Sequence, residues 1–169
     1  MSHLNQFFNL ETVEGLIRKL LLIFIVTLSF GYGTGVYYVA ITSGNSTKTI
    51  QENYLGNEED ESAKTMKFKK PEKEIISIIH SRVISFSLIF LAMGILFFLT
   101  PYSSRLKSFL IIEPFVSILI TFGGIWLMWK GLVWMKYLII ISGLLMHLSF
   151  LVMGVLILIT LLKPRVKHF

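Results

Sequence analysis

Four long apolar segments alternate with polar ones along the chain. Each is at least as long as the ~20 residues with which an α-helix crosses the ~30 Å hydrocarbon core of a bilayer. The pattern therefore predicts an all-α fold, an integral membrane bundle of four transmembrane helices that forms a single membrane domain over residues 1–169. The predicted spans are residues 17–41, 71–100, 109–128 and 137–162.

The segments outside the spans differ in length and composition. Residues 1–16 carry scattered apolar side chains and are predicted to lie on the membrane surface as an interfacial lead-in. Residues 42–70 form the longest hydrophilic stretch, an acidic run followed by a lysine-rich one, and we expect a solvated loop there. The apolar residues expected to anchor this loop to the outer ends of the spans are Tyr54, Leu55, Met66 and Phe68.

Basic residues mark one side of the predicted bundle. Four crossings return the chain to the side on which it began, so the two termini share that side. The basic residues that flank the spans on this side include Arg18, Lys19, Arg105 and Lys107. Because cytoplasmic loops are enriched in Lys and Arg, the pattern predicts cytoplasmic termini and an extracytoplasmic loop at 42–70. The expected location is the bacterial inner membrane.

Composition narrows the possible partners. The chain is 54% hydrophobic and 15% charged, with a mean hydropathy of +0.71, whereas soluble domains hold about 25% charged residues. A net charge of +6 then indicates contact with anionic lipid headgroups. No basic stripe with interleaved aromatic residues is present, so nucleic acid is not an expected partner. The chain has no cysteine, which excludes disulfides, iron–sulfur clusters, thiolate zinc sites and covalently attached haem.

Polar residues inside the spans recur on single helix faces. One such stripe in the third span comprises Glu113, Ser117, Thr121 and Gly124. We expect these stripes mainly to pack helix against helix. Glu113 is expected to reach the cytoplasmic interface or to pair with Arg105 or Lys107, and movement of a proton or ion through Glu113 is a lesser alternative.

Two histidines form the candidate site. His147 lies in the middle of the fourth span, where a neutral imidazole needs partners for both ring nitrogens, and His80 lies where the charged start of the second span meets its apolar run. One interpretation is a single b-type haem between these spans, with His80 and His147 as the metal ligands. Gly143 would leave room for the porphyrin, and Arg82 would offer its guanidinium to a propionate. At 1.5 Å per residue the two histidines differ in depth by roughly 7 Å, or about twice that if Arg82 marks the water boundary.

This layout resembles small four-helix b-type cytochromes and the haem- or quinone-bearing membrane anchors of respiratory complexes. The resemblance is one of layout, and it implies electron transfer with a quinone or a respiratory complex. The expected partners are then the lipid bilayer and other membrane subunits. The alternative is a non-catalytic membrane interaction or assembly subunit, with His80 at the interface and His147 used in helix packing. The sequence offers no nucleophile–base pair, phosphate-binding loop or pair of carboxylates, so no catalytic residue is proposed.

Overall fold

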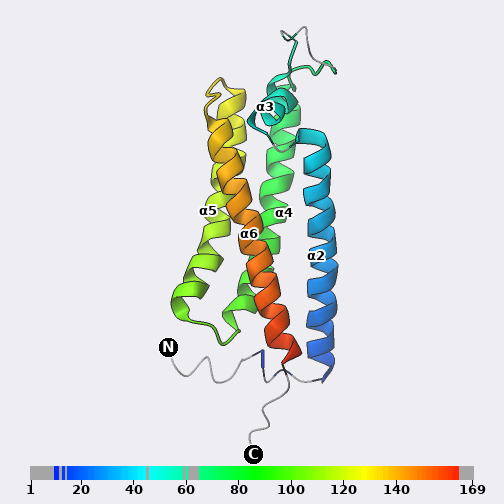
Figure 1. The fold of residues 1–169 in the computed structure, drawn as a ribbon, viewed down its shortest axis with the longest axis vertical. Coiled ribbons are helices and arrows are strands. Elements are labelled where there is room, and N and C mark those ends of the chain that lie inside the picture. Colours follow the sequence, from blue (N-terminus) through cyan, green and yellow to red (C-terminus); the bar gives the residue numbers. More distant parts are fainter. Residues whose placement is uncertain are drawn as a thin grey trace, which may run out of the picture.

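The computed structural model describes residues 10–11, 13, 15–44, 46–58, 60 and 65–163, which form helices joined by short connections (Figure 1). Four of these helices are long and apolar enough to cross a membrane, which confirms the predicted all-α membrane bundle. No strand occurs within the described ranges. The helices are α2 (Gly15–Ser43), α3 (Thr47–Leu55), α4 (Glu72–Phe98), α5 (Ser104–Trp129) and α6 (Met135–Leu162).

The long helices extend beyond some of the predicted spans. The largest difference is at the start of α5, which begins at Ser104 rather than at residue 109. A bilayer requires about 20 apolar residues, whereas the helix itself continues into the polar interface because its backbone hydrogen bonds do not depend on side-chain polarity. Hydrophobicity therefore located the crossings but not the helix ends.

Helices α5 and α6 form an antiparallel pair joined by the turn at residues 130–134, and α4 packs along both (Figure 1). The centre of the bundle is filled by fully buried apolar side chains such as Phe97, Met128, Met153 and Ile157. The α5 backbone packs closely on the side chain of Ile139 at Gly124, where an added Cβ would lie 3.0 Å from Cγ1 of Ile139.

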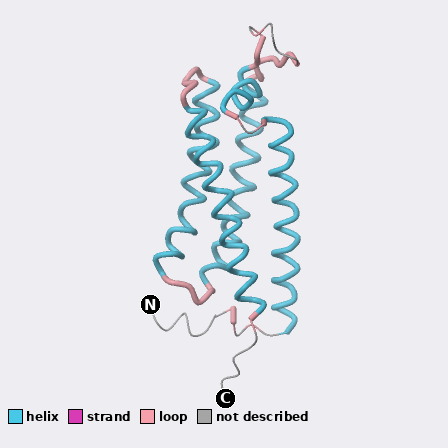
Figure 2. The backbone as a smooth tube through the Cα atoms, viewed as in Figure 1, coloured by secondary structure: helices cyan, strands magenta, loops and turns pink. Residues whose placement is uncertain are grey.

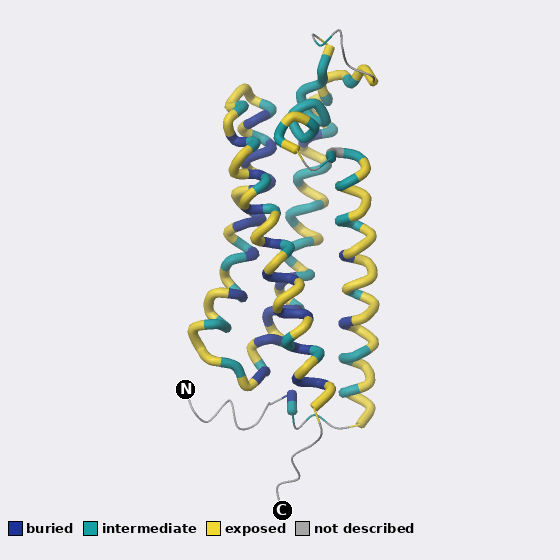
Figure 3. Tube along the Cα trace, viewed as in Figure 1, coloured by how far each residue is buried: buried dark blue, intermediate teal, exposed yellow. Residues whose placement is uncertain are grey.

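Helix α2 lies at the edge of the bundle, beside α4 and α6, and most of its length is exposed (Figure 3). Only Ile25 and Tyr32 of α2 are buried. Near its first turn, Arg18 donates from Nη2 to the carbonyl oxygen of Lys163 at 2.7 Å. The start of α2 and the end of α6 are thus held at the same end of the bundle.

The predicted lead-in at residues 1–16 falls mostly outside the described residues. Of the described part, Leu10 is 2% exposed, and its backbone N–H donates to the carbonyl oxygen of Leu99 at 3.1 Å. Glu11 lies 3.6 Å from Nζ of Lys163. These contacts attach the described lead-in to the ends of α4 and α6 rather than leaving it only on the membrane surface.

The segment predicted as a solvated loop contains the helix α3, which lies across the end of the bundle (Figure 2). Its start is fixed by a reciprocal cap in which Ser46 Oγ accepts from the Thr49 N–H and Thr49 Oγ1 accepts from the Ser46 N–H, both at 3.1 Å. Tyr54 and Leu55 pack against the core as predicted. Met66 and Phe68 are 63% and 69% exposed, so the prediction that they anchor the loop was wrong.

Residues 65–70 fold back onto the end of α3 through Gly56 and Asn57. Gly56 has φ +82°, and a Cβ there would lie 2.7 Å from the backbone nitrogen of Lys69, so only glycine fits without strain. The Asn57 N–H donates to the carbonyl oxygen of Lys67 at 2.9 Å. Trp129 Nε1 then donates to the carbonyl oxygen of Lys70 at 2.8 Å, which ties the connection to the end of α5. Packing on the span ends therefore orders this part of the connection.

Candidate functional site

A membrane-embedded carboxylate connects α5 to α6. Glu113 is half-buried in α5, nine residues after its start, or about 13 Å along the axis. Ser117, one turn later on the same face, donates to Oε1 of Glu113, and Ser149 of α6 donates to Oε2. Both serines are almost fully buried. One side chain thus accepts hydrogen bonds from both helices.

A second polar contact joins the same two helices farther along. The hydroxyls of Thr121 and Ser142 lie 2.7 Å apart, and both residues are buried. Ser142 Oγ also donates to the carbonyl oxygen of Leu138 at 2.7 Å, which leaves its oxygen free to accept from the Thr121 hydroxyl. The stripe predicted on α5 therefore forms an interhelical seam, as expected from small and polar residues in membrane helices.

The expectation that Glu113 reaches the interface or pairs with Arg105 or Lys107 was wrong. Arg105 lies eight residues earlier, or about 12 Å along the helix. Lys107 projects toward α4, where its Nζ lies 5.6 Å from the ring centroid of Phe98. In the described part of the chain, no Lys, Arg or His forms an ion pair with Glu113.

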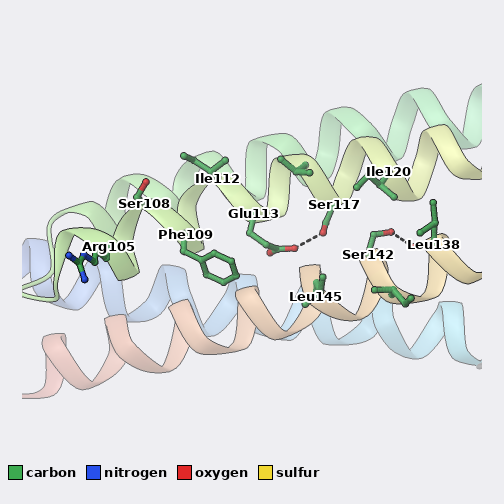
Figure 4. Close-up of a pocket in the computed structure, with 12 residues that line it drawn as sticks. Arg105, Ser108, Phe109, Ile112, Glu113, Ser117, Ile120, Leu138, Ser142 and Leu145 are labelled. Carbon is green, nitrogen blue, oxygen red and sulfur yellow. Dashed lines mark hydrogen bonds between the residues drawn. The ribbon is translucent and has the colours of Figure 1, made fainter.

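Glu113 also lines an open groove on the outer side of the α5–α6 pair (Figure 4). The groove has a volume of about 670 Å³. Arg105 and Ser108 lie at its end near the start of α5, and Figure 4 shows the Glu113 carboxylate directed toward Ser117 farther along. We define the α5/α6 groove by its lining residues, which are Arg105, Ser108, Phe109, Ile112, Glu113, Val116, Ser117, Ile120, Leu138, Ile141, Ser142 and Leu145.

Tyr32 of α2 inserts an aromatic ring between α4 and α6. Its ring stacks on Phe150 with centroids 3.7 Å apart and an angle of 6° between the planes. Phe86 and Phe90 of α4 meet it edge-on at 5.9 and 6.4 Å. Its hydroxyl is buried and has no hydrogen-bond partner among the described side chains and backbone. This ring supplies the aromatic contact of α2 with the rest of the bundle.

The imidazole of His147 contacts residues close to it in the bundle. Its Nδ1 lies 2.5 Å from the carbonyl oxygen of Gly143, one turn earlier, and its ring packs against Tyr32 with centroids 5.5 Å apart. His80 is exposed on α4, and Arg82 is half-buried two residues later. A Cβ added at Gly143 would meet nothing within 4 Å. The structure therefore places Gly143 and His147 together, and no contact joins them to His80 or Arg82 in the described chain.

The two histidines also differ in depth. Phe90 contacts Phe150, and Met93 contacts Gly154. A residue of α4 is therefore level with the residue of α6 that stands about sixty positions later in the sequence. His147 is then level with Ser87, and His80 lies about 10 Å nearer the start of α4. That offset exceeds the 7 Å expected from sequence and disfavours one iron held between both imidazoles. Within the described ranges, no three His, Asp or Glu side chains converge as a metal site.

Two residues of the seam, Ser142 and Ser149, were not singled out from sequence. They are seven residues apart, which is two helical turns, so they share a face of α6. That spacing matches the stripe of Glu113, Ser117 and Thr121 on α5. A comparison of the polar stripes between spans is the signal that finds them.

Comparison with known proteins identifies the domain. Residues 44–168 match the model of a family described as Aq_1264_TM, a transmembrane helical domain. The match covers α3 to α6 and therefore the whole α5/α6 groove. No curated protein and no solved structure matches the chain. Since the match extends over well more than half of its residues, the chain belongs to the Aq_1264_TM family of transmembrane helical domains.

Proposed function

We propose that the protein is a non-catalytic membrane subunit that binds a transmembrane helix of another membrane protein in the α5/α6 groove. The observation that carries the proposal is Glu113, a carboxylate inside a membrane span that opens onto this groove. Ionisable residues within membrane spans are rare and usually mark functional sites.

The energetics favour a further partner for Glu113. A charged side chain at the centre of a membrane helix costs about 2.5–3.5 kcal/mol on insertion scales. The hydrogen bonds from Ser117 and Ser149 offset less than half of this, since interhelical hydrogen bonds in membranes average ~0.6 kcal/mol each. A partner that approaches from the open side of the groove can supply the remaining stabilisation.

The shape of the groove suits a helix. Its walls on α5 extend from Arg105 to Ile120, which is about 22 Å of helix axis. The wall residues recur every three or four positions on both helices, and such ridges receive the side chains of a third helix. Its polar groups are few and lie on one line along the groove. The contact between α5 and α6 has the same arrangement of polar groups.

Site-directed photocrosslinking in native membranes tests this proposal. A benzophenone side chain at Val116 or Leu145, both in the groove, should crosslink to the same single protein partner. Leu151 is the matched control because it is 58% exposed and lies about one turn or less from the level of Ser149. A groove that crosslinks only to lipid, or a control that captures the same protein equally well, would contradict the proposal.

We also propose that both termini face the cytoplasm. The end of the bundle that holds the start of α2 also carries Arg18, Lys19, Arg105 and Lys107, which supports this orientation by the positive-inside rule. The lysines of the opposite end are mixed with acidic residues. An impermeant amine reagent applied to intact cells should label the lysines at positions 67–70 and spare Lys163. The reverse labelling would invert the orientation and leave the four spans unchanged.

The haem hypothesis stays a prediction. His80 and His147 differ in depth by about 10 Å. For both to ligate one b-type haem, α4 or α6 would have to shift along its axis by about this distance. The optical spectrum of the protein purified from an iron-replete host tests it directly. A Soret band that is lost in His147→Ala would restore electron transfer with a quinone or respiratory complex as the leading function.

A further inference from the structure

We infer that the helix bound in the α5/α6 groove presents a lysine or arginine to Glu113. The inference rests on the proposed function and names the chemistry of the partner. It starts from the carboxylate itself, which carries two bonds from serine hydroxyls. Each carboxylate oxygen has two lone pairs, so both oxygens of Glu113 retain capacity for a second donor.

Within the described ranges, no lysine or arginine supplies a cation at this depth. The Tyr32 hydroxyl of α2, which interacts electrostatically with Glu113, is a neutral group and brings no positive charge. Arg105 is about 12 Å away along α5, and Lys107 faces Phe98 on the other side of the helix. The groove walls beside Glu113 are apolar at Val116, Ile141 and Leu145. A cation that enters between these walls meets the carboxylate in a medium of low dielectric, where the attraction is far stronger than in water.

A lipid headgroup does not fit this position. Headgroup amines lie at the membrane interface, which is the level of Arg105 rather than that of Glu113. The acyl region of a lipid would then contact the carboxylate without satisfying it. A side chain on a transmembrane helix is the group that brings a positive charge to this depth.

A second copy of this chain does not fit either. Glu113 is level with Ser149 through their hydrogen bond, and therefore with residue 89 of α4. Lys107 lies about 9 Å from that level along α5 and faces α4, and Arg82 lies about 10 Å from it, closer to the start of α4. Two copies in the same membrane orientation share their levels, so neither Lys107 nor Arg82 of one copy would meet Glu113 of the other.

Arg105 adds a second element of recognition. Its guanidinium at the end of the groove repels a basic residue at the same level of the partner and attracts an acidic one. The eight residues between Arg105 and Glu113 correspond to about two turns of a bound helix. The complementary partner therefore carries an acidic or neutral polar residue near its interface and a basic residue about eight positions deeper in its span.

The probe for this inference is a set of synthetic transmembrane peptides. All peptides share a leucine–alanine sequence with one Glu at the membrane interface. They differ at one position, eight residues deeper in the span, which is Lys, Leu or Glu. Binding to the full-length protein is measured by energy transfer in zwitterionic phosphatidylcholine vesicles. The Lys peptide should bind at least about tenfold more tightly than the Leu peptide, and the Glu peptide more weakly than either.

Three variants separate recognition from folding. Glu113→Gln keeps an acceptor for Ser117 and should lower the affinity for the Lys peptide to that for the Leu peptide. Glu113→Lys should reverse the preference in favour of the Glu peptide. Glu72→Gln, which removes a carboxylate outside the groove, is the control and should change nothing. Circular dichroism and gel filtration report whether each variant remains folded.

The outcomes distinguish this inference from the proposed function. Equal binding of the Lys and Leu peptides, with both blocked by Val116→Trp, would overturn the role of the cation and retain the groove as a helix-binding site. Preference for Lys that persists in folded Glu113→Gln would overturn the assignment to Glu113. Failure of every peptide together with crosslinks only to lipid would overturn both proposals.

Discussion

Helices α5 and α6 are joined to each other far more tightly than α2 is joined to the bundle. In the most apolar stretch of α5 and of α6, 44% of the residues are buried, compared with 11% in α2. The α5–α6 pair combines close packing of Ile139 on Gly124 with the hydrogen bonds of Glu113 and Thr121. Helix α2 relies on the ring of Tyr32, on the buried side chain of Ile25 and on a hydrogen bond from Arg18.

The difference shows what holds helices together in a bilayer. Lipid tails are as apolar as leucine side chains, so burial alone gives little drive for association. Close packing, interhelical hydrogen bonds and ring stacking must supply it. The α5–α6 pair uses the first two, and α2 uses mainly the third. We therefore expect the pair to be the stable unit and α2 to be the part that separates first.

The largest expected effect is the loss of the close packing between α5 and α6. Gly124→Leu should destabilise the protein by about 1–3 kcal/mol, because the side chain would overpack against Ile139. Unfolding in mixed detergent micelles measures the change. Gly123→Leu is the matched control, since a Cβ at Gly123 meets nothing within 4 Å. Equal losses in the two variants would show that helix propensity, rather than packing, explains the effect.

The next effect concerns the attachment of α2. Tyr32→Leu removes the stack on Phe150 and should cost about 0.5–1.5 kcal/mol, the usual value of an aromatic pair. Hydrogen exchange should speed up in α2 and stay slow in α5 and α6. Tyr32→Phe is the control, because it keeps the ring and removes only the hydroxyl that lacks a partner. A large loss in Tyr32→Phe would instead reveal an unrecognised partner of that hydroxyl.

A smaller effect isolates one hydrogen bond of the seam. A double-mutant cycle of Thr121→Val and Ser142→Ala should give a coupling energy of ~0.6 kcal/mol, the average for interhelical hydrogen bonds in membranes. Unfolding of the two single variants and the double variant in the same micelles supplies the cycle. A coupling energy of zero would mean that packing alone holds the two helices at this level.

The smallest effect is expected on the exposed face of α2. Gly31, Gly33 and Gly35 each have open space where a Cβ would be placed. Gly33→Ala should leave stability unchanged or raise it by up to about 1 kcal/mol, because glycine disfavours the helix. Thermal unfolding of the purified protein measures this. A destabilised Gly33→Ala variant would indicate that α2 packs through this face and is less peripheral than described.

The transmembrane crossings were predictable because bilayer thickness imposes a length that hydrophobicity reveals. The pairing of helices was not, since the same apolar surface packs against lipid or against any neighbour. Glu113 illustrates the limit. Its stripe on α5 was recognised, but its partner Ser149 lies in a different span. The offset between α4 and α6, and hence the depth of His80 relative to His147, also depends on packing that a single sequence does not display.

The missed helix α3 has a more local reason. Its cap uses Thr49 where a capping box usually has Glu or Gln, and the acidic and basic runs that follow dominate the composition. The spacing of Ile50 and Tyr54, four residues apart on one helix face, was the available signal. A short amphipathic segment is easily obscured when most of the residues around it are charged.

The contact between Tyr32 and Phe150 has a consequence for biosynthesis. The ribosome makes Phe150 about 120 residues after Tyr32, a delay of roughly 6–24 s at ~5–20 residues per second. Helix α2 must therefore enter the bilayer first and remain without this contact until the last span emerges, while α5 and α6 pair as soon as both are inserted. The first helix to be translated is therefore the last to dock.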